Sequence, residues 1–495
     1  MIAASSVSLW AAHLWLVALL PMAGAALLAL LPAQRLAARL NLALAAAQFG
    51  LILALAARGR GPEAALLHLD ALNLPLLLLA GVIGVTTALY SAATIRGEGF
   101  GPRAGRAYHA AFQVFLGANA LALLAEDLGV MWVAVEAATV ATVLMVALHR
   151  TPASIEAAWK FLVLCGTGIA LALFGTIALA LAAQPLGEGG ATALSFGVLR
   201  QMAPEADPRL LSLAFVFLLV GYGTKAGLAP LHSWLPDAHA EGPMAISAVL
   251  SGLLLNTALH AILRARAVVS GNPEVLPPGA LMLAMGLASV LLAAFALWRR
   301  RDARRLFAWS SIEHMGLASM AFGLGGPAAL AGMLHLLGHS LVKSAVFFGL
   351  GRAIQIKGSQ RIAAIGGLAE SHPLLGWSLA LAILAAAGLP PFVLFASEVL
   401  LMQQMVTRLP WLALPLGLGL LLAALALLKV LQALCFGPGR AGVPPPDQRH
   451  WLGHPAAEWA TLLPLHLHLL LALLLGLALP AAGLALLTEA AGIAG

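Results

Sequence analysis

Four lysines lie inside long apolar stretches of the sequence, where a charged side chain is costly. They are Lys160, Lys225, Lys343 and Lys429, and Lys357 is the only lysine in a polar segment. An isolated charge at the centre of a bilayer costs at least about 2.5–3.5 kcal/mol. Arginine stays charged in proteins, whereas a buried lysine can shift its pKa and release its proton. This distribution of lysine predicts proton exchange inside a membrane.

Glu136 and Lys225 carry opposite charges at similar depth in two apolar segments. We predict that they approach to ion-pair or one-water distance. In such a pair the carboxylate keeps the lysine protonated, and loosening of the pair lets the lysine release its proton. A static ion pair that only holds two helices together is the alternative.

His335, His339 and Lys343 are spaced four residues apart within one apolar segment. On a helix they form one stripe about 12 Å long. Histidine titrates near neutral pH and can pass protons along a hydrogen-bonded chain, so the stripe predicts a relay that ends at a lysine. The two histidines alone could bind a metal ion, but no third ligand stands near them in the sequence. We therefore predict no metal site.

Other ionisable or polar residues in apolar segments extend this candidate set. Glu398 is the last acid within the membrane and a candidate terminal site, and His260 is a candidate bridge between the halves of the chain, or an interfacial residue because Arg264 follows it closely. Glu313 is a candidate lining residue of a cytoplasmic entrance. Lys160, beside Glu156, and Lys429 either take part in the relay or extend to the membrane surface.

The elements that must position these side chains are transmembrane helices. Hydrophobic residues make up 61% of the 495 positions and charged residues only 9%, which excludes a set of soluble domains and predicts an all-α polytopic membrane protein. Windows of about 20 apolar residues give about fourteen segments, at 10–31, 37–57, 71–93, 108–124, 127–148, 158–183, 211–230, 243–264, 278–298, 306–325, 328–353, 374–404, 411–436 and 461–488.

Basic residues predict the orientation of these segments. The odd-numbered loops hold sixteen lysines and arginines and the even-numbered loops hold seven. Because positive charges favour the cytoplasmic side, both termini are predicted to lie on the non-cytoplasmic side. The net charge of +7 therefore reports topology and does not indicate nucleic-acid binding. Cys165 and Cys435 have no CxxC spacing, so we predict no cofactor in this chain.

Two stretches of the chain repeat the same order of features. Glu136, Lys160 and the GLAP sequence at 227–230 in the first are matched by Glu313, Lys343 and GLPP at 388–391 in the second. We predict two five-helix repeats, each with a broken helix, and the odd number of helices per repeat gives the second repeat inverted topology. Broken helices at matching places in two halves mark an ion path. A simple proline kink is the alternative at each break. The breaking residues are Gly227, Pro230, Gly388, Pro390 and Pro391.

The predicted organisation follows from these repeats. A three-helix segment spans 1–107, the first repeat spans 108–268, the second repeat spans 269–436, and a polar loop with a C-terminal helix spans 437–495.

Three sequence stretches resemble a known family. KAGLAPLHSWLPDAHAEGPMAISAVLSGLLL (225–255), HLLGHSLVKSAVFF from His335 and the GLPP break are similar to the proton-translocating antiporter-like subunits of complex I, Mrp antiporters and membrane-bound hydrogenases. The resemblance covers roughly 70–440. WVAVEAATVATVLMVALHRTPASIEAAWKFL (132–162) and AWSSIEHMG (308–316) resemble component F of hydrogenase-4 complexes.

The resemblance implies roles for the candidate residues. It matches Glu136, Lys225, His335, His339, Lys343 and Glu398 to a hydrophilic axis that moves protons, driven by a redox module elsewhere. At Asn256, many relatives have a lysine; asparagine cannot titrate, so solvent or His260 must bridge this gap.

The resemblance also implies an environment for the chain. It predicts a non-catalytic subunit of an oxidoreductase complex in a bacterial or archaeal inner membrane, without a redox cofactor of its own. Its partners would be other membrane subunits, a peripheral redox module and the lipid bilayer. An Mrp-type sodium/proton antiporter subunit and a non-pumping membrane anchor are the alternatives.

Overall fold

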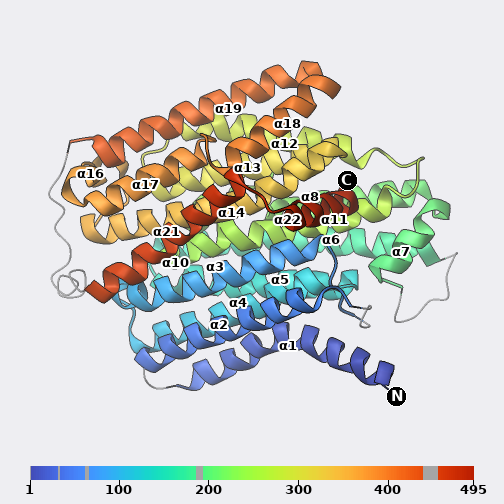
Figure 1. Ribbon diagram of the computed structural model, residues 1–495, viewed down its shortest axis with the longest axis horizontal. Coiled ribbons are helices and arrows are strands. Elements are labelled where there is room, and N and C mark those ends of the chain that lie inside the picture. The colour runs from blue at the N-terminus through green and yellow to red at the C-terminus, as the bar shows by residue number, and fades with distance from the viewer. Residues whose placement is uncertain (1, 32–33, 62–65, 185–192, 439–454) are drawn as a thin grey trace.

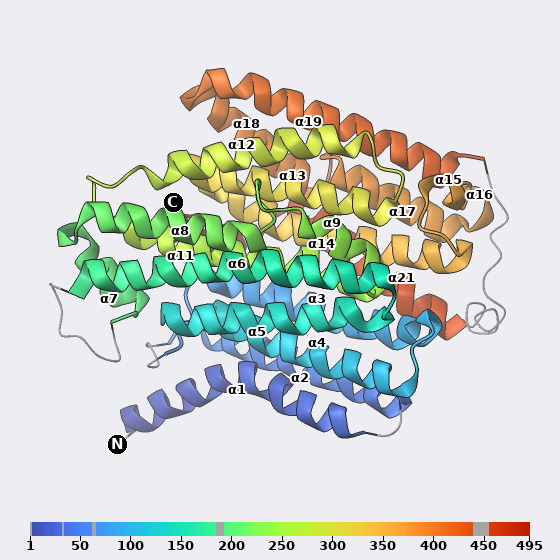
Figure 2. The same ribbon diagram turned by 180° about the vertical axis from the view of Figure 1, so that it is seen from behind.

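The computed structural model describes residues 2–31, 34–61, 66–184, 193–438 and 455–495 of the chain. This described part is almost entirely helical and contains no strand. The axes of most long helices lie roughly parallel to one another (Figures 1 and 2). α1 lies at one edge of the bundle, and α18 and α19 lie at the opposite edge. The predicted all-α fold is therefore confirmed.

The first half of the chain contains most of the uninterrupted long helices. In chain order its helices are α1 (Ile2–Leu30), α2 (Gln34–Arg58), α3 (Asn73–Thr94), α4 (Pro102–Leu124), α5 (Leu128–Val146), α6 (Pro152–Ala183), α7 (Phe196–Met202), α8 (Pro208–Lys225), α9 (Trp234–Glu241), α10 (Met244–Val249) and α11 (Leu255–Val269). A single π-helical turn, Leu250–Leu254, joins α10 to α11 and makes them one continuous helix.

The second half ends in two helices that pack back onto the bundle. Its helices are α12 (Pro278–Leu297), α13 (Ala303–Leu324), α14 (Pro327–Lys357), α15 (Ile362–Ile365), α16 (Leu368–Ser371), α17 (Pro373–Ala386), α18 (Val393–Arg408), α19 (Pro410–Leu431), α21 (Pro455–Leu477) and α22 (Ala481–Ala494). α21 crosses the bundle and packs against α14 and α3 (Figure 1).

Two membrane-length helices lie at the centre of the bundle. The most apolar windows of Met244–Val269 and of α14 are 100% buried within the chain, compared with 28% for α2 and 33% for Pro410–Phe436. Lipid or partner subunits can therefore reach the outer helices but not these two. Polar residues on the central pair are shielded from hydrocarbon by protein on every side.

Both predicted helix breaks are present, and they share one backbone pattern. α8 ends at Lys225 and α17 ends at Ala386, and each is followed by a glycine with positive φ, +75° at Gly227 and +66° at Gly388. The next residue then donates its N–H to a carbonyl five positions back, Leu228 to Gly223 and Leu389 to Leu384. All five predicted breaking residues lie in the unwound segments.

Two details differ from the predicted segments. The first break comes at the end of the predicted segment 211–230. It is followed by a short helix, α9, where no segment was predicted. The predicted single segment 461–488 is wrong, because the chain interrupts it before α22, where Pro480 precedes the first turn. The predicted polar loop of 437–460 lies largely outside the described residues.

Eleven helices of the described residues are long and apolar enough to cross a membrane, and a bent pair at 362–386 gives up to twelve. The remaining predicted segments coincide with α8 and α13, which are more polar or shorter. The count of fourteen and the inverted relation of the repeats stay predictions.

Both ends of the chain lie at the same end of the bundle as the even-numbered loops. The Trp10 side chain in α1 packs against Gly61, and the Ala494 carbonyl accepts a hydrogen bond from Arg266 at the end of α11. Which side of the membrane this end faces is a prediction from the charge distribution alone.

Candidate ion pathway

Lys225 and Glu136 form an ion pair inside the bundle. The Lys225 Nζ lies 2.9 Å from Glu136 Oε2 and also donates a hydrogen bond to Thr139 Oγ1. Thr139 follows Glu136 by one turn on α5, so a single face of this helix holds the ammonium. The predicted approach of these two residues is therefore observed.

The first helix break places this lysine. Lys225 is the last residue of α8, and the unwound segment after it is closed by Trp234, whose Nε1–H donates to the Thr224 carbonyl at 2.8 Å. Ala229 N–H donates to Ser289 Oγ on α12 at 2.8 Å. The freed backbone groups thus find partners in the protein, which is the condition for irregular backbone at membrane depth.

Glu136 connects the pair to the outer surface of the bundle. Its side chain is 26% exposed, whereas that of Lys225 is fully buried. The exposed edge opens on an apolar groove of about 450 Å³ lined by α4 and α5, including Val114, Trp132 and Val140. A carboxylate in such a groove is costly against lipid, so this face favours cover by another protein.

The predicted relay residues of α14 lie in the core of the bundle. His335, His339 and Lys343 are 2%, 0% and 0% exposed, so the stripe does not face lipid. Lys343 Nζ donates to the Phe307 carbonyl of α13 at 2.8 Å, and His339 Nε2 lies 3.5 Å from Ser251 Oγ in the π-helical turn. π-turns are frequent at functional sites.

Asn256 faces the same region. Its Nδ2 donates to Ser340 Oγ at 2.7 Å, next to His339 on α14. Ser251 Oγ is also 2.7 Å from Ser311 Oγ of α13. Hydroxyl and amide groups therefore line the space between the two central helices at the position where relatives are expected to have a lysine.

His335 belongs to a second polar cluster at the other helix break. Its Nε2 lies 3.2 Å from Nδ1 of His314 on α13, and its Nδ1 lies 2.9 Å from Ser397 Oγ on α18. His314 Nε2 lies 3.1 Å from the Ala386 carbonyl at the end of α17. His314 adjoins Glu313 in the sequence but was not among the predicted site residues, because its partners come from two other helices, α14 and α17.

Glu398 approaches this cluster. One of its carboxylate oxygens and one ring nitrogen each of His314 and His335 lie within 4.8 Å of one another. Glu398 is partly exposed, and its carboxylate packs against Gly388 in the unwound segment. The second break therefore brings an acid to the relay, as the first break brings a lysine to an acid.

Glu313 is deeply buried, at 3% exposure, and its predicted place at a cytoplasmic entrance stays a prediction. It interacts electrostatically with Lys343 and Glu398.

Lys160 and Lys429 lie at the surface of the bundle. Lys160 is 47% exposed and pairs with Glu156 at 2.6 Å and Asp237 at 3.1 Å, and Arg305 binds the other oxygen of Asp237 at 3.2 Å. Lys429 is exposed beside the Trp298 ring. Both lysines are therefore outside the buried core, as the surface alternative requires.

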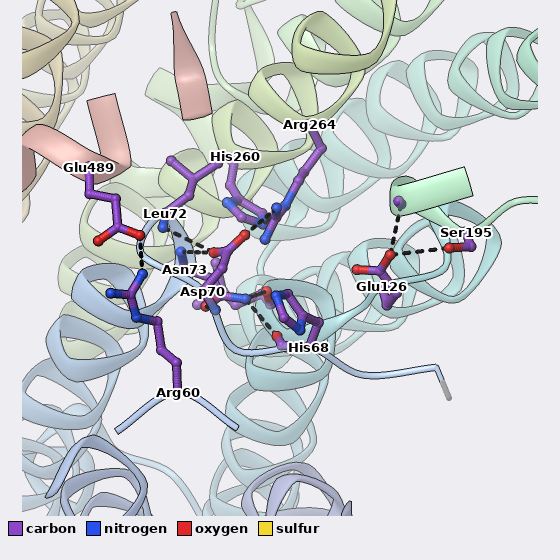
Figure 3. Close-up of polar contacts among 12 residues, drawn as sticks. Arg60, His68, Asp70, Leu72, Asn73, Glu126, Ser195, His260, Arg264 and Glu489 are labelled. Carbon is purple, nitrogen blue, oxygen red and sulfur yellow. Dashed lines mark hydrogen bonds and ion pairs between the residues drawn. The ribbon is translucent and has the colours of Figure 1, made fainter. Parts of the chain in front are cut away.

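His260 on α11 is buried beside the ion pair between Arg264 and Asp70. Arg264 Nη1 binds Asp70 Oδ2 at 2.5 Å, and Arg264 Nε lies 3.4 Å from His260 Nε2 (Figure 3). Asp70 also accepts the backbone N–H groups of Leu72 and Asn73, so it fixes the start of α3. His260 is thus held toward the even-loop end, and its predicted bridging role stays a prediction.

Glu126, near this cluster, serves a loop. Its Oε1 accepts from Ser195 Oγ and Gly197 N, which ties the start of α7 to the start of α5 (Figure 3). Arg60 and Glu489 pair nearby at the surface.

Several buried polar atoms of the core have no protein partner among the described residues. They include Oε2 of Glu313, Nδ1 of His339, Oδ1 of Asn256 and both ring nitrogens of His239. Buried polar groups in this position are commonly satisfied by internal water.

A helical bundle with two broken helices and a buried row of acids, lysines and histidines defines the class of polytopic ion-transport proteins.

The chain belongs to the NADH:quinone oxidoreductase/Mrp antiporter transmembrane family, whose model matches residues 125–423. It is 49% identical over 391 residues to the hydrogenase-4 component F homolog of Methylacidiphilum infernorum (isolate V4), covering 78% of this chain and 82% of that protein. It is 29% identical over 388 residues to hydrogenase-4 component B of Escherichia coli (strain K12), covering 75% of this chain and 56% of that protein.

Solved structures share the fold. A chain of the Mrp complex from Dietzia sp. DQ12-45-1b matches with a TM-score of 0.82 and 21% identity, covering 98% of this chain and 97% of its own. A chain of respiratory complex I from Thermus thermophilus matches with a TM-score of 0.80 and 24% identity, covering 97% and 100%. The predicted family resemblance is therefore confirmed, including the likeness to hydrogenase-4 component F.

Proposed function

We propose that this chain is a proton-translocating, antiporter-like membrane subunit of a redox-driven multisubunit complex in a bacterial or archaeal inner membrane. The observation that carries the proposal is the Lys225–Glu136 ion pair inside the bundle. A lysine held by one carboxylate keeps its proton while paired and releases it when the carboxylate moves or is neutralised. The pair thus forms a site that can be loaded and discharged.

The remaining axis lies between the two helix breaks. Lys343 and His339 occupy the central helix, and the second break brings Glu398 toward His335. Serine and asparagine groups on the facing helices, with internal water, supply the links that Asn256 cannot provide by titration. In this proposal a proton moves along the core in the plane of the membrane as well as across it.

Partner subunits are part of the proposal. The apolar groove at Glu136 places a carboxylate on the outer face, and a neighbouring membrane subunit would shield it from lipid. The relatives named for hydrogenase-4 and the solved complex I chain support assembly into a larger complex. The peripheral redox module that would drive transport belongs to those partners.

Proton uptake by everted vesicles containing the assembled complex, energised by the native electron donor, tests this function. Lys225→Ala should reduce the initial rate at least about tenfold, because a positioned proton-transfer group commonly contributes more than that. Lys160→Ala is the matched control and should keep the rate, since Lys160 is paired at the surface. Normal uptake by verified, assembled Lys225→Ala complex would exclude the proposed role.

Sodium/proton exchange is the competing function, favoured by the fold shared with the Mrp chain. The same vesicles distinguish it, because exchange would make proton movement depend on external Na⁺ in the absence of an electron donor. A membrane anchor would show intact assembly and an unchanged rate in both Lys225→Ala and Glu136→Gln.

A further inference from the structure

The two histidines at the second break present one ring nitrogen each to the same small space. His314 Nδ1 and His335 Nε2 are 3.2 Å apart. In a tetrahedral zinc site with Zn–N distances of about 2.0–2.1 Å, two ligand nitrogens lie about 3.3–3.4 Å apart. The histidine pair therefore already has the separation of two ligands on one metal ion.

The protonation pattern of His314 is fixed by its other contact. Its Nε2 faces the Ala386 carbonyl at 3.1 Å, and a carbonyl can only accept. Nε2 must therefore carry the proton, which leaves a lone pair on Nδ1 when the ring is neutral. This lone pair points to His335.

Ser397 sets the corresponding choice on His335. The Ser397 hydroxyl donates to the Leu394 carbonyl at 2.8 Å, and its oxygen then accepts from His335 Nδ1 at 2.9 Å. In that arrangement His335 Nε2 also carries a lone pair, and two lone pairs face each other. If the hydroxyl instead turns to His335, then Nε2–H of His335 donates to His314. In the first state both lone pairs can bind one cation between the rings, and in the second state they cannot.

Glu398 supplies the third ligand that the sequence alone did not reveal. A carboxylate oxygen of Glu398 and one ring nitrogen of each histidine lie within 4.8 Å of one another, and a rotation of the partly exposed Glu398 side chain would bring that oxygen to ligand distance. Two imidazoles and one carboxylate are the protein ligands of open zinc sites, in which water takes the fourth position. The Ala386 and Ser397 contacts hold the rings from behind, as outer contacts of metal-bound histidines do.

We propose that His314 Nδ1, His335 Nε2 and a Glu398 carboxylate oxygen form a binding site for a divalent transition-metal ion of the zinc class. Two imidazole ligands select this class over Na⁺, Mg²⁺ and Ca²⁺, which prefer oxygen ligands. Metal binding would hold Ser397 in the state that donates to Leu394. It would also replace the hydrogen bond between the histidines, so a bound ion and the hydrogen-bonded pair exclude each other.

Zn²⁺ binding to the full-length chain in detergent, measured by competition with a chromophoric chelator, tests the site. His314→Gln and His335→Gln should each weaken one stoichiometric site at least about a hundredfold, because outer contacts alone are commonly worth 10–100-fold. Ser397→Ala, which removes such a contact, should weaken it about tenfold. His466→Gln is the control, since His466 binds Ser378 on another face, and it should leave the affinity unchanged.

A second measurement does not depend on the variants folding. X-ray absorption of the Zn²⁺-loaded wild-type chain should show two imidazole nitrogens and light oxygen ligands, and excess Na⁺ should not displace the metal. Stoichiometric binding that survives both histidine substitutions, a ligand shell without two imidazoles, or no stoichiometric binding at all would overturn the proposal.

Discussion

The Lys225 ammonium lies 2.9 Å from the Glu136 carboxylate, although 89 positions separate the two residues. The pair is unequal, because the lysine side chain is fully buried and the glutamate side chain is 26% exposed. Loss of the glutamate strands a charge in the core, whereas loss of the lysine leaves a carboxylate that reaches the groove. The two halves of the pair therefore have different structural consequences.

We expect Glu136→Ala to destabilise the chain by about 3 kcal/mol, because an unpaired buried charge is left behind. Lys225→Met should cost less, and the double variant Glu136→Leu with Lys225→Met should recover most of the loss. Thermal unfolding of the detergent-solubilised chain measures this order. A double variant that is less stable than Glu136→Ala would show that the pair contributes through other contacts.

This pair was predictable because the sequence shows the sign of each charge and its position within an apolar segment. Glu136 and Lys225 each stand in an apolar segment at similar depth, and a single pairing satisfies both. His314 was not predictable in the same way, since its partners His335 and Ala386 are set by the packing of α13 against α14 and α17. The one signal for His314 in the sequence was its position next to Glu313, and only Glu313 was predicted as a site residue.

Gly388→Ala tests how the second break holds Glu398. The residue has φ of +66°, and an added Cβ would collide with the Glu398 carboxylate. A left-handed conformation costs a non-glycine residue about 1–2 kcal/mol, and displacement of the carboxylate adds to this. We expect lower thermal stability than for Gly417→Ala on α19, where the nearest atom to an added Cβ is a flexible methionine methyl at 3.7 Å. Equal melting temperatures would contradict this packing.

Asp70 gives an expected dependence on pH at the even-loop end. Burial by itself raises the pKa of Asp70, but Arg264 and the backbone N–H of Asn73 outweigh it and hold the pKa below its usual range. A carboxylate with a depressed pKa in the folded state stabilises the fold above its unfolded pKa, about 3.9, and this contribution is lost as the pH falls through the folded value. Acid unfolding of the solubilised chain should therefore become less steep in Asp70→Asn. If acid unfolding is equally steep in Asp70→Asn and in the unmodified chain, other groups cause the dependence on pH.

Lysine depth was the feature that sequence alone resolved least. All four helix lysines stand in apolar segments, yet Lys225 and Lys343 are fully buried while Lys160 pairs with Asp237 of α9. Asp237 follows a helix break and belongs to α9, which lies between two of the predicted segments. A long flexible side chain can reach the surface from several turns inside a helix, so depth along the chain does not fix the depth of its charge.

Buried Lys343 and exposed Lys429 allow a direct test of whether burial separates the lysines that move protons. Lys343→Met removes a buried ammonium that donates to the Phe307 carbonyl, and methionine fills a similar volume, so the bundle should still assemble. Proton uptake in vesicles should fall at least about tenfold, because the central helix then lacks its titrating group. Lys429→Met is the matched control: Lys429 is exposed and lies 5.6 Å from the Trp298 ring, so uptake should be unchanged. If both variants assemble and lose uptake equally, burial does not separate the lysines that move protons from those that do not, and the central axis is wrong.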